Sequence, residues 1–185
     1  YTTGIEHGTI TAVIDEYKFE ITSLREDVLT DGRHAKVKFS KDWKEDASRR
    51  DFTINSIYSD SEGNLFDPYN GKKDLETGNI NFIGKAEKRI KEDYLRILRY
   101  VRFFLNYSKQ KHKPEIIRKL KINIGGVSKL SKERLLDELK KIINLKTLEK
   151  LNQDKLSLEL IIMVFPELKN INFFSKLNSK IIFFF

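Results

Sequence analysis

The sequence predicts an α+β fold in which a partial mixed sheet over residues 1–84 precedes an all-helical region over residues 85–185. The first region contains short segments rich in Thr, Val, Ile and aromatic residues, separated by turn residues, which is typical of β-strands. From about Ala86 the apolar residues recur with a period near 3.6, which is typical of α-helices. We therefore expect two domains with a boundary after residue 84.

The first region is predicted to contain a hairpin, a second turn and one short helix. Two strand-like segments flank Asp15-Glu16, which is a hairpin signal. The polar segment 43–50 (WKEDASRR) has helical spacing and predicts a short surface helix. The expected strands are residues 9–14 (TITAVI), 17–24 (YKFEITSL), 57–58, 64–66 and 80–83 (INFI).

The second region is predicted to contain four helices. The first is long, because four apolar residues at i, i+4, i+7 and i+11 form one buried stripe: Tyr94, Leu98, Val101 and Leu105. Pro114 begins the second helix and Gly125-Gly126 ends it. Ser131 caps the third, whose core face carries Leu135, Leu136, Leu139, Ile142 and Ile143. The fourth covers about residues 147–164, before Pro166.

Composition excludes several classes of protein. The chain has 185 residues and a net charge of +8, which favours a polyanionic partner. It has no Cys, which excludes a disulfide framework, cysteine zinc sites and thiol catalysis. No apolar run approaches the roughly 20 residues of a membrane span, so we expect a soluble, cytoplasmic protein. Its single Met is Met163, and we expect the chain to be an internal piece of a longer protein.

Residues 49–55 (RRDFTIN) form the first candidate ligand-binding segment. Arginine offers planar, bidentate donors to phosphate, while Asp51 and Asn55 can bond sugar hydroxyls. This pattern suits a nucleotide. The alternative is an exposed helix end with an Arg–Asp pair, which composition alone favours about two to one.

Residues 89–103 form the second segment. On a helix, Glu92, Asp93, Arg96 and Arg99 would share one side. Asp93 and Arg96 could hold each other rigid and present a joint acceptor and donor edge to a base, and Arg99 and Arg102 could carry charge toward a triphosphate. The alternative is a solvent-exposed helix face that carries several weak ion pairs.

Glu20 is the third candidate. Strand alternation places it on the face opposite Phe19 and Ile21, and a strand carboxylate can help to position a divalent cation. An exposed glutamate on a half-buried strand is the simpler alternative. The three histidines lack the spacing of a metal site or a catalytic triad.

Taken in order, these segments resemble the tRNA nucleotidyltransferase/poly(A) polymerase family, most closely its bacterial CCA-adding enzymes. The resemblance covers residues 1 to about 168 and is carried by GIEHGTIT (4–11), FEITSLRED (19–27), DGRHAKVKFSKDWKEDASRRDFTIN (31–55), EGNLFDPYNGKKDLE (62–76), IGKAEKRIKEDYLRILRYVRFF (83–104) and LSKERLLDELKKI (130–142). It implies a polymerase-β-like nucleotidyltransferase head, a helical neck and the start of a helical body. Such enzymes add nucleotides to an RNA 3′ end without a nucleic-acid template.

The resemblance also implies roles for individual residues. Arg50 matches an arginine that contacts the incoming CTP or ATP, with the Asp51 and Asn55 positions helping around sugar and phosphates. Asp93 and Arg96 match the residues that read the base, and Arg99 and Arg102 match others of the nucleotide site. Glu20 matches a strand acid that could be the third acid beside the metal pair. Tyr94 departs from the family, where proline is usual.

One further departure is an absence. Family members carry an Asp-x-Asp pair upstream of the His-Gly-Thr segment, which binds two Mg²⁺ ions; this chain does not contain it. We therefore expect the Mg²⁺ ligands to lie mainly in a separate N-terminal segment, supplied in cis or in trans, and the fragment alone to be inactive. Its expected partners are CTP, ATP and the tRNA 3′ end. The alternatives are a poly(A) polymerase, or a split or catalytically dead fragment that only binds nucleotide or RNA.

Overall fold

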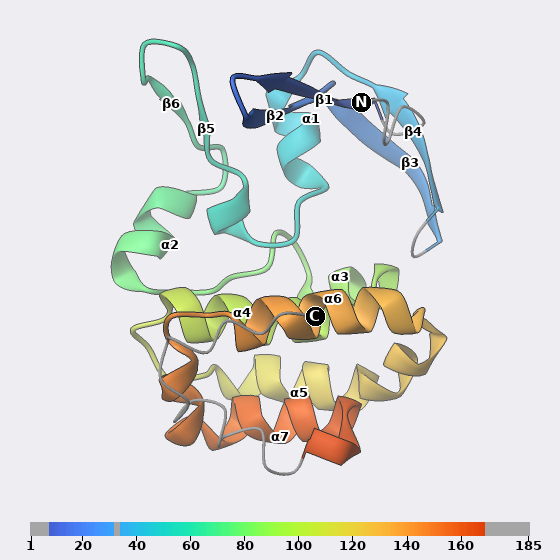
Figure 1. Ribbon diagram of the computed structural model, residues 1–185, viewed down its shortest axis with the longest axis vertical. Helices are drawn as coiled ribbons and strands as arrows, with labels where there is room; N and C mark the ends of the chain where they lie inside the picture. The colour runs from blue at the N-terminus through green and yellow to red at the C-terminus, as the bar shows by residue number, and fades with distance from the viewer. Residues whose placement is uncertain (1–7, 32–33, 169–185) are drawn as a thin grey trace.

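The computed structural model describes residues 8–31 and 34–168, with β-hairpins at one end of the molecule and helices at the other (Figure 1). The strands are β1 (Thr9–Ile14), β2 (Tyr17–Thr22), β3 (Arg25–Asp31), β4 (His34–Phe39), β5 (Tyr58–Ser59) and β6 (Leu65–Phe66). The helices are α1 (Trp43–Ser48), α2 (Gly71–Thr77), α3 (Ala86–Glu92), α4 (Arg96–Tyr107), α5 (Pro114–Asn123), α6 (Lys132–Ile143) and α7 (Lys155–Val164). Short 3₁₀ helices are η2 (Thr53–Asn55), η3 (Ile124–Lys129), η4 (Leu148–Asn152) and η5 (Pro166–Leu168).

The strands form three separate antiparallel pairs, β1–β2, β3–β4 and β5–β6. The predicted hairpin is confirmed, with Thr9 opposite Thr22 and Ile14 opposite Tyr17. The β3–β4 pair and helix α2 were not predicted.

The α+β fold class is confirmed, but every strand pair that the structure describes is antiparallel instead of mixed, because short turns connect sequential strands. Residues 80–83 form only a single bridge, between Phe52 and Phe82.

The β1–β2 hairpin leaves its apolar side chains in solvent. Alternation predicted one covered face, but all six residues of β2 are exposed. Phe19 keeps 49% and Ile21 54% of its accessible surface. Neither face of β2 is therefore buried by the part of the chain that the structure describes.

The helices enclose one hydrophobic core. Helices α4 and α6 lie over α5 and α7 (Figure 1), and Leu98, Val101 and Leu105 of the predicted stripe are buried at 0–1% exposure. The core crosses residue 84, because the Phe52 ring lies 5.2 Å from the Phe103 ring, centroid to centroid. The boundary after residue 84 stays a prediction. None of the described helices is long and apolar enough to cross a membrane.

Two predicted helices are broken by an aspartate. The first ends at Glu92 and restarts at Arg96, because Asp93 is extended (φ −153°, ψ 107°) and its side chain accepts a hydrogen bond from the Leu95 amide. The fourth is interrupted before Lys155, because Asp154 caps α7 by accepting from the Ser157 amide at 3.1 Å.

Further predictions about the helical half have mixed outcomes. Ser131 caps α6 as predicted, and Leu139 and Ile142 are buried. Leu136 is not a core residue, since it is 50% exposed. The chain continues past α5 into η3 through Gly125-Gly126, and the Tyr94 ring lies directly on Gly126, where an added Cβ would come within 2.1 Å of the ring.

Candidate functional site

The first part of the site is the end of α1, where a buried carboxylate holds two arginines. Asp46 is 1% exposed. Its Oδ1 accepts from Arg49 Nη2 at 2.6 Å, and its Oδ2 accepts from Arg50 Nη2 at 2.9 Å and from the Tyr58 hydroxyl at 2.8 Å. The i+3 and i+4 spacing places both guanidiniums over this carboxylate. Arg50 remains 39% exposed at its side chain and so can also reach a ligand.

The charges around Asp46 set the pKa values of this cluster. Burial by itself raises the pKa of Asp46, but hydrogen bonds from Arg49, Tyr58 and Arg50 outweigh it and hold the pKa below its ordinary value. Burial and the hydrogen bond to Asp46 raise the pKa of Tyr58 to about 12. Asp46 is therefore a carboxylate and Tyr58 a hydrogen-bond donor at neutral pH.

The second part is Asp51, which is 6% exposed. Its backbone carbonyl accepts from the Ile83 amide at 3.0 Å, which fixes the segment in place. Its Oδ1 accepts from Asn55 Nδ2 at 2.7 Å, and its Oδ2 accepts from Arg99 Nε at 2.5 Å. Burial raises the pKa of Asp51, but the bond and charge of Arg99 lower it by more. Asp51 and Asn55 are thus brought together with Arg99 of α4, as the sequence predicted for one site.

Helix α3 adds a second connection between the same two regions. Arg89 Nη2 donates to the backbone carbonyls of Arg49 and Arg50. Its Nη1 pairs with Glu92 at the end of the same helix. Arg89 and Arg99 therefore hold the end of α1 and the Asp51 segment against α3 and α4.

The predicted pairing of Asp93 with Arg96 is wrong. Arg96 Nη1 lies 2.9 Å from Glu92 Oε2, and Asp93 Oδ2 accepts from Arg134 Nη2 at 2.7 Å. The reason is the break after Glu92: Asp93 is not helical, so its side chain leaves the face that Glu92 and Arg96 share. The prediction that Glu92, Asp93, Arg96 and Arg99 share one helix face fails for Asp93.

The last predicted residue, Arg102, is held by α6. Its Nε donates to Glu138 Oε1 at 2.5 Å, and Glu138 is 1% exposed. The guanidinium carbon lies 4.5 Å from the centroid of the Phe103 ring. Figure 1 shows α6 beside α4, which explains why α6 supplies both Arg134 and Glu138 to this site.

Charge effects show that these groups form one cluster. The charge of Arg96 contributes to lowering the pKa of Asp51. Burial lowers the pKa of Arg99, but Asp51 raises it by more, with further contributions from Glu138 and Asp93. The cluster therefore contains Asp51, Asn55, Asp93, Arg96, Arg99 and Arg102. Arg50 lies on the adjoining turn and donates two hydrogen bonds to Asp46.

The arginines of the cluster keep unused donors. Each guanidinium has five N–H groups in a planar fork. Arg99 and Arg102 each use Nε for their internal carboxylate, which leaves both Nη groups without a hydrogen bond to described residues. The internal acids thus orient the guanidiniums while the Nη groups remain able to bind an anion.

Glu20 is not part of this cluster. It lies on β2 opposite Thr11 and is exposed. Among residues 8–31 and 34–168, no group of three or more acidic or histidine side chains could hold a metal ion. The described donor set therefore does not fit a metal centre, and the assignment of Glu20 stays a prediction.

Sequence reasoning missed four residues that position the site: Asp46, Arg89, Arg134 and Glu138. The spacing of Asp46 before Arg49 and Arg50 was a usable signal, because i+3 and i+4 neighbours share a helix face. The pairing of α6 with α4 had no local signal, because Arg134 is 41 residues from its partner Asp93.

Residues 1–81 match the model of the poly A polymerase head domain. Human mitochondrial CCA tRNA nucleotidyltransferase 1 is 51% identical over 142 residues, 76% of this chain and 33% of that protein. The CCA-adding enzyme of Lactobacillus johnsonii is 41% identical over 144 residues, 76% of this chain and 35% of that protein. The crystal structure of the Bacillus stearothermophilus CCA-adding enzyme in complex with CTP superposes with a TM-score of 0.72 and 29% identity, over 86% of this chain and 37% of that chain.

Fold and sequence together define a nucleotidyltransferase head followed by a helical region. The chain is similar to members of the tRNA nucleotidyltransferase/poly(A) polymerase family. The predicted resemblance to bacterial CCA-adding enzymes is confirmed, and the vertebrate mitochondrial relatives share a higher fraction of identical residues, 48–51% against 37–41%. The chain spans about a third of the length of the curated relatives it matches.

Proposed function

We propose that this chain forms the nucleotide-reading part of an RNA nucleotidyltransferase that adds CCA to the 3′ end of tRNA, using CTP and ATP and no nucleic-acid template. The observation that carries the proposal is the arginine cluster on α4, which faces Asp51 and Asn55 across a buried ion pair. The names of the relatives, CCA-adding enzymes and CCA tRNA nucleotidyltransferases, and the CTP complex of the structural neighbour support it.

Each group has a defined task in this proposal. The free Nη groups of Arg99 and Arg102 bind the phosphates, and Arg50 adds a further cation. Asn55 and the Asp51 carboxylate bind ribose hydroxyls. Arg96 offers donors and Asp93 offers acceptor lone pairs to the base edge, a combination that distinguishes bases by their hydrogen-bonding pattern.

A divalent metal belongs to the chemistry of this family. When bound, Mg²⁺ activates the attacking hydroxyl and stabilises the leaving pyrophosphate. Because the residues described do not provide a metal centre, we derive no metal-dependent step from them. We propose that the ligands lie mainly in an N-terminal segment that carries the Asp-x-Asp pair, joined to this chain or supplied in trans.

The test is incorporation of labelled CTP and ATP into tRNA lacking its 3′ CCA, with Mg²⁺. The chain is assayed alone and with a separately expressed N-terminal segment carrying the Asp-x-Asp strand. Activity in the mixture only supports the proposal, and incorporation of ATP alone favours a poly(A) polymerase. Activity of the chain alone would refute the placement of the metal ligands.

Substitutions separate base reading from phosphate binding. Asp93→Ala and Arg96→Ala should relax the choice of base, with a loss of about 1–3 kcal/mol in discrimination for each good bidentate contact. Arg50→Ala should weaken all nucleotides alike, and Arg118→Ala, an exposed arginine on α5, is the control. A wild-type CTP and ATP preference in both base-reading variants would contradict the assignment.

The second candidate is a fragment that binds nucleotide or RNA without catalysis. The arginine-rich site suits this candidate, since arginine side chains can bind the phosphates of a nucleotide without any catalytic step. Tighter binding of CTP and ATP than of GTP, with no incorporation in either assay, would support this candidate. Equal weak binding of all four nucleotides would indicate a basic RNA-binding protein without nucleotide specificity.

A further inference from the structure

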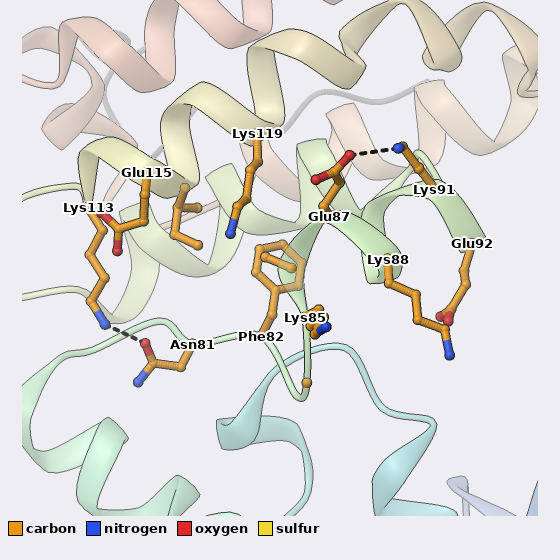
Figure 2. Close-up of a pocket in the computed structure, with 13 residues that line it drawn as sticks. Asn81, Phe82, Lys85, Glu87, Lys88, Lys91, Glu92, Lys113, Glu115 and Lys119 are labelled. Atoms are coloured by element: carbon orange, nitrogen blue, oxygen red, sulfur yellow. Dashed lines mark hydrogen bonds and ion pairs between the residues drawn. The ribbon is translucent and has the colours of Figure 1, made fainter.

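A second cationic region lies outside the nucleotide cluster, in a pocket of about 1010 Å³ between α3 and α5. None of the predicted nucleotide-binding residues lines it. Figure 2 shows lysine side chains from both helices around this pocket, with the Phe82 ring between them. The five lysines that line it are Lys85, Lys88, Lys91, Lys113 and Lys119.

The positive charge of this pocket is only partly neutralised. Lys91 pairs with Glu87 at 2.6 Å, and Lys113 donates to the neutral Asn81 side chain at 2.7 Å. No ion pair within the described chain involves Lys85, Lys88 or Lys119.

The acids of the pocket are largely engaged elsewhere. Three acids line it, Glu87, Glu92 and Glu115. Glu87 is paired with Lys91, and Glu92 is paired with Arg89 and Arg96. Five lysines and three acids line the pocket, and one of these acids, Glu92, is paired with arginines outside it, so the pocket has an excess of cations that an anion can neutralise.

The arrangement of the lysines suits a chain of phosphates better than a single ion. Lys85 lies at the N-cap of α3, and Lys88 and Lys91 lie on its first and second turns, so the three cations are spread along the length of this helix. Lys119 of α5 and Lys113, the residue before α5, line the opposite part of the pocket (Figure 2). An inorganic phosphate would meet one position in this row, whereas a nucleic-acid backbone carries a charge at every nucleotide and can meet several.

The pocket also adjoins the nucleotide cluster. Glu92 lines the pocket and binds Arg96, one of the predicted base-reading residues. A strand lying along α3 would therefore pass directly beside the cluster at the end of this helix.

We propose that this α3–α5 pocket binds the phosphate backbone of the RNA whose 3′ end enters the nucleotide site. The inference rests on the proposed function for the identity of the RNA. Its geometric basis, the excess of lysines that line the pocket, is independent of the nucleotide cluster.

The test compares two triple variants that remove the same charge. The pocket variant is Lys85→Gln, Lys88→Gln and Lys119→Gln, and the control is Lys72→Gln, Lys73→Gln and Lys140→Gln, three exposed lysines on α2 and α6. Binding of tRNA lacking its 3′ CCA is measured by fluorescence anisotropy over a series of KCl concentrations. Binding of CTP is measured separately, and circular dichroism confirms that each variant is folded.

We expect the pocket variant to bind the tRNA ~100-fold more weakly at 0.1 M salt, because it loses three phosphate contacts and each weakens binding by about 5-fold. The slope of log Kd against log salt should fall by about 2, at ~0.7 per contact to a single strand. The control should retain wild-type slope and affinity, and CTP affinity should be unchanged in both.

Three results would overturn the inference. They are equal losses in the pocket variant and the control, a loss of CTP binding without a loss of tRNA binding, and failure of the unaltered chain to bind the tRNA. The last result leaves the proposed function standing if the chain still binds CTP. Conversely, pocket-dependent tRNA binding without CTP binding supports the pocket and refutes the nucleotide site.

Discussion

The substitution Asp51→Asn tests whether one buried ion pair stabilises the junction between the Asp51 segment and α4. Asp51 is 6% exposed and accepts hydrogen bonds from the Phe52 amide at 3.0 Å, from Asn55 at 2.7 Å and from Arg99 at 2.5 Å. Asparagine has nearly the same volume and keeps one oxygen, which can continue to accept from Phe52 and Asn55. Its amide nitrogen then faces Arg99 Nε, so two donors meet where a charge-assisted bond existed.

The expected cost follows from the burial of the two partners. A hydrogen bond to a charged group contributes about 1.5–3 kcal/mol, and removing one partner of a fully buried pair costs about 3–5 kcal/mol. The Arg99 side chain is 28% exposed and can be partly rehydrated, which reduces the cost. We expect the free energy of unfolding to fall by about 2–3 kcal/mol, a shift of roughly 1 M in the urea midpoint.

The loss of stability caused by Asp51→Asn should become smaller as the pH falls into the acid range. The folded-state pKa of Asp51 lies below its unfolded value, despite the opposing effect of burial, because of Arg99. Its stabilisation is therefore fully present above the ordinary carboxyl pKa of about 4 and is lost as pH falls through the lower folded-state pKa. The difference between wild type and variant should be constant from about pH 5 to 8 and should shrink in acid.

Urea unfolding followed by circular dichroism at several pH values measures both effects. Asp60→Asn is the control, because Asp60 also has a lowered pKa, mainly from Asn64, but is fully exposed; little change is expected there. An Asp51→Asn protein within about 0.5 kcal/mol of wild type would refute the reasoning, since ordinary surface substitutions reach that size. A difference that persists undiminished at pH 3 would refute its electrostatic part.

Three further substitutions test other parts of the fold. His112→Ala should lower the free energy of unfolding by about 2–4 kcal/mol in a urea titration, because the buried ring lies 2.9 Å from Asp154 and 3.5 Å from the centre of an aromatic ring; an unchanged midpoint would contradict this. Gly126→Ala should cost about 1–3 kcal/mol through its clash with Tyr94, and a double variant with Tyr94→Ala should cost less than the sum; strict additivity would argue against the clash. Arg134→Ala should change the relative Kd values for CTP and ATP by about 1–3 kcal/mol by releasing the base-reading aspartate, whereas equal changes for both nucleotides would indicate a general effect.

Local patterns predicted much of the helical half. The stripe of Leu98, Val101 and Leu105 is buried as the 3.6-residue period required, and Ser131 caps α6. Two predicted helices are each interrupted in the structure, and both interruptions have the same cause. Asp93 and Asp154 each bond a nearby backbone amide, which competes with the helical pattern and ends it.

The candidate site was predicted less completely. Six of the seven predicted nucleotide-binding residues form one cluster and Arg50 adjoins it, but the predicted partner of Arg96 is wrong, and the sequence suggested no partner for Arg99 or Arg102. Arg96 binds Glu92, Arg99 binds Asp51 and Arg102 binds Glu138. The residues were identifiable because the family segments are contiguous in sequence, whereas all three of these partners lie outside α4, the helix that carries the arginines.

The sequence by itself determined the α+β class, the order of hairpin and helices, the family resemblance and the residue types available for binding a nucleotide. These properties depend on neighbours within a few positions, through periodicity, turns and caps. Only the tertiary structure decided which acid orients each arginine and which lysines remain unpaired between α3 and α5. The physical reason is that ion pairs over 36–48 residues of chain depend on how the helices pack, and helix packing is set by the whole core and not by local spacing.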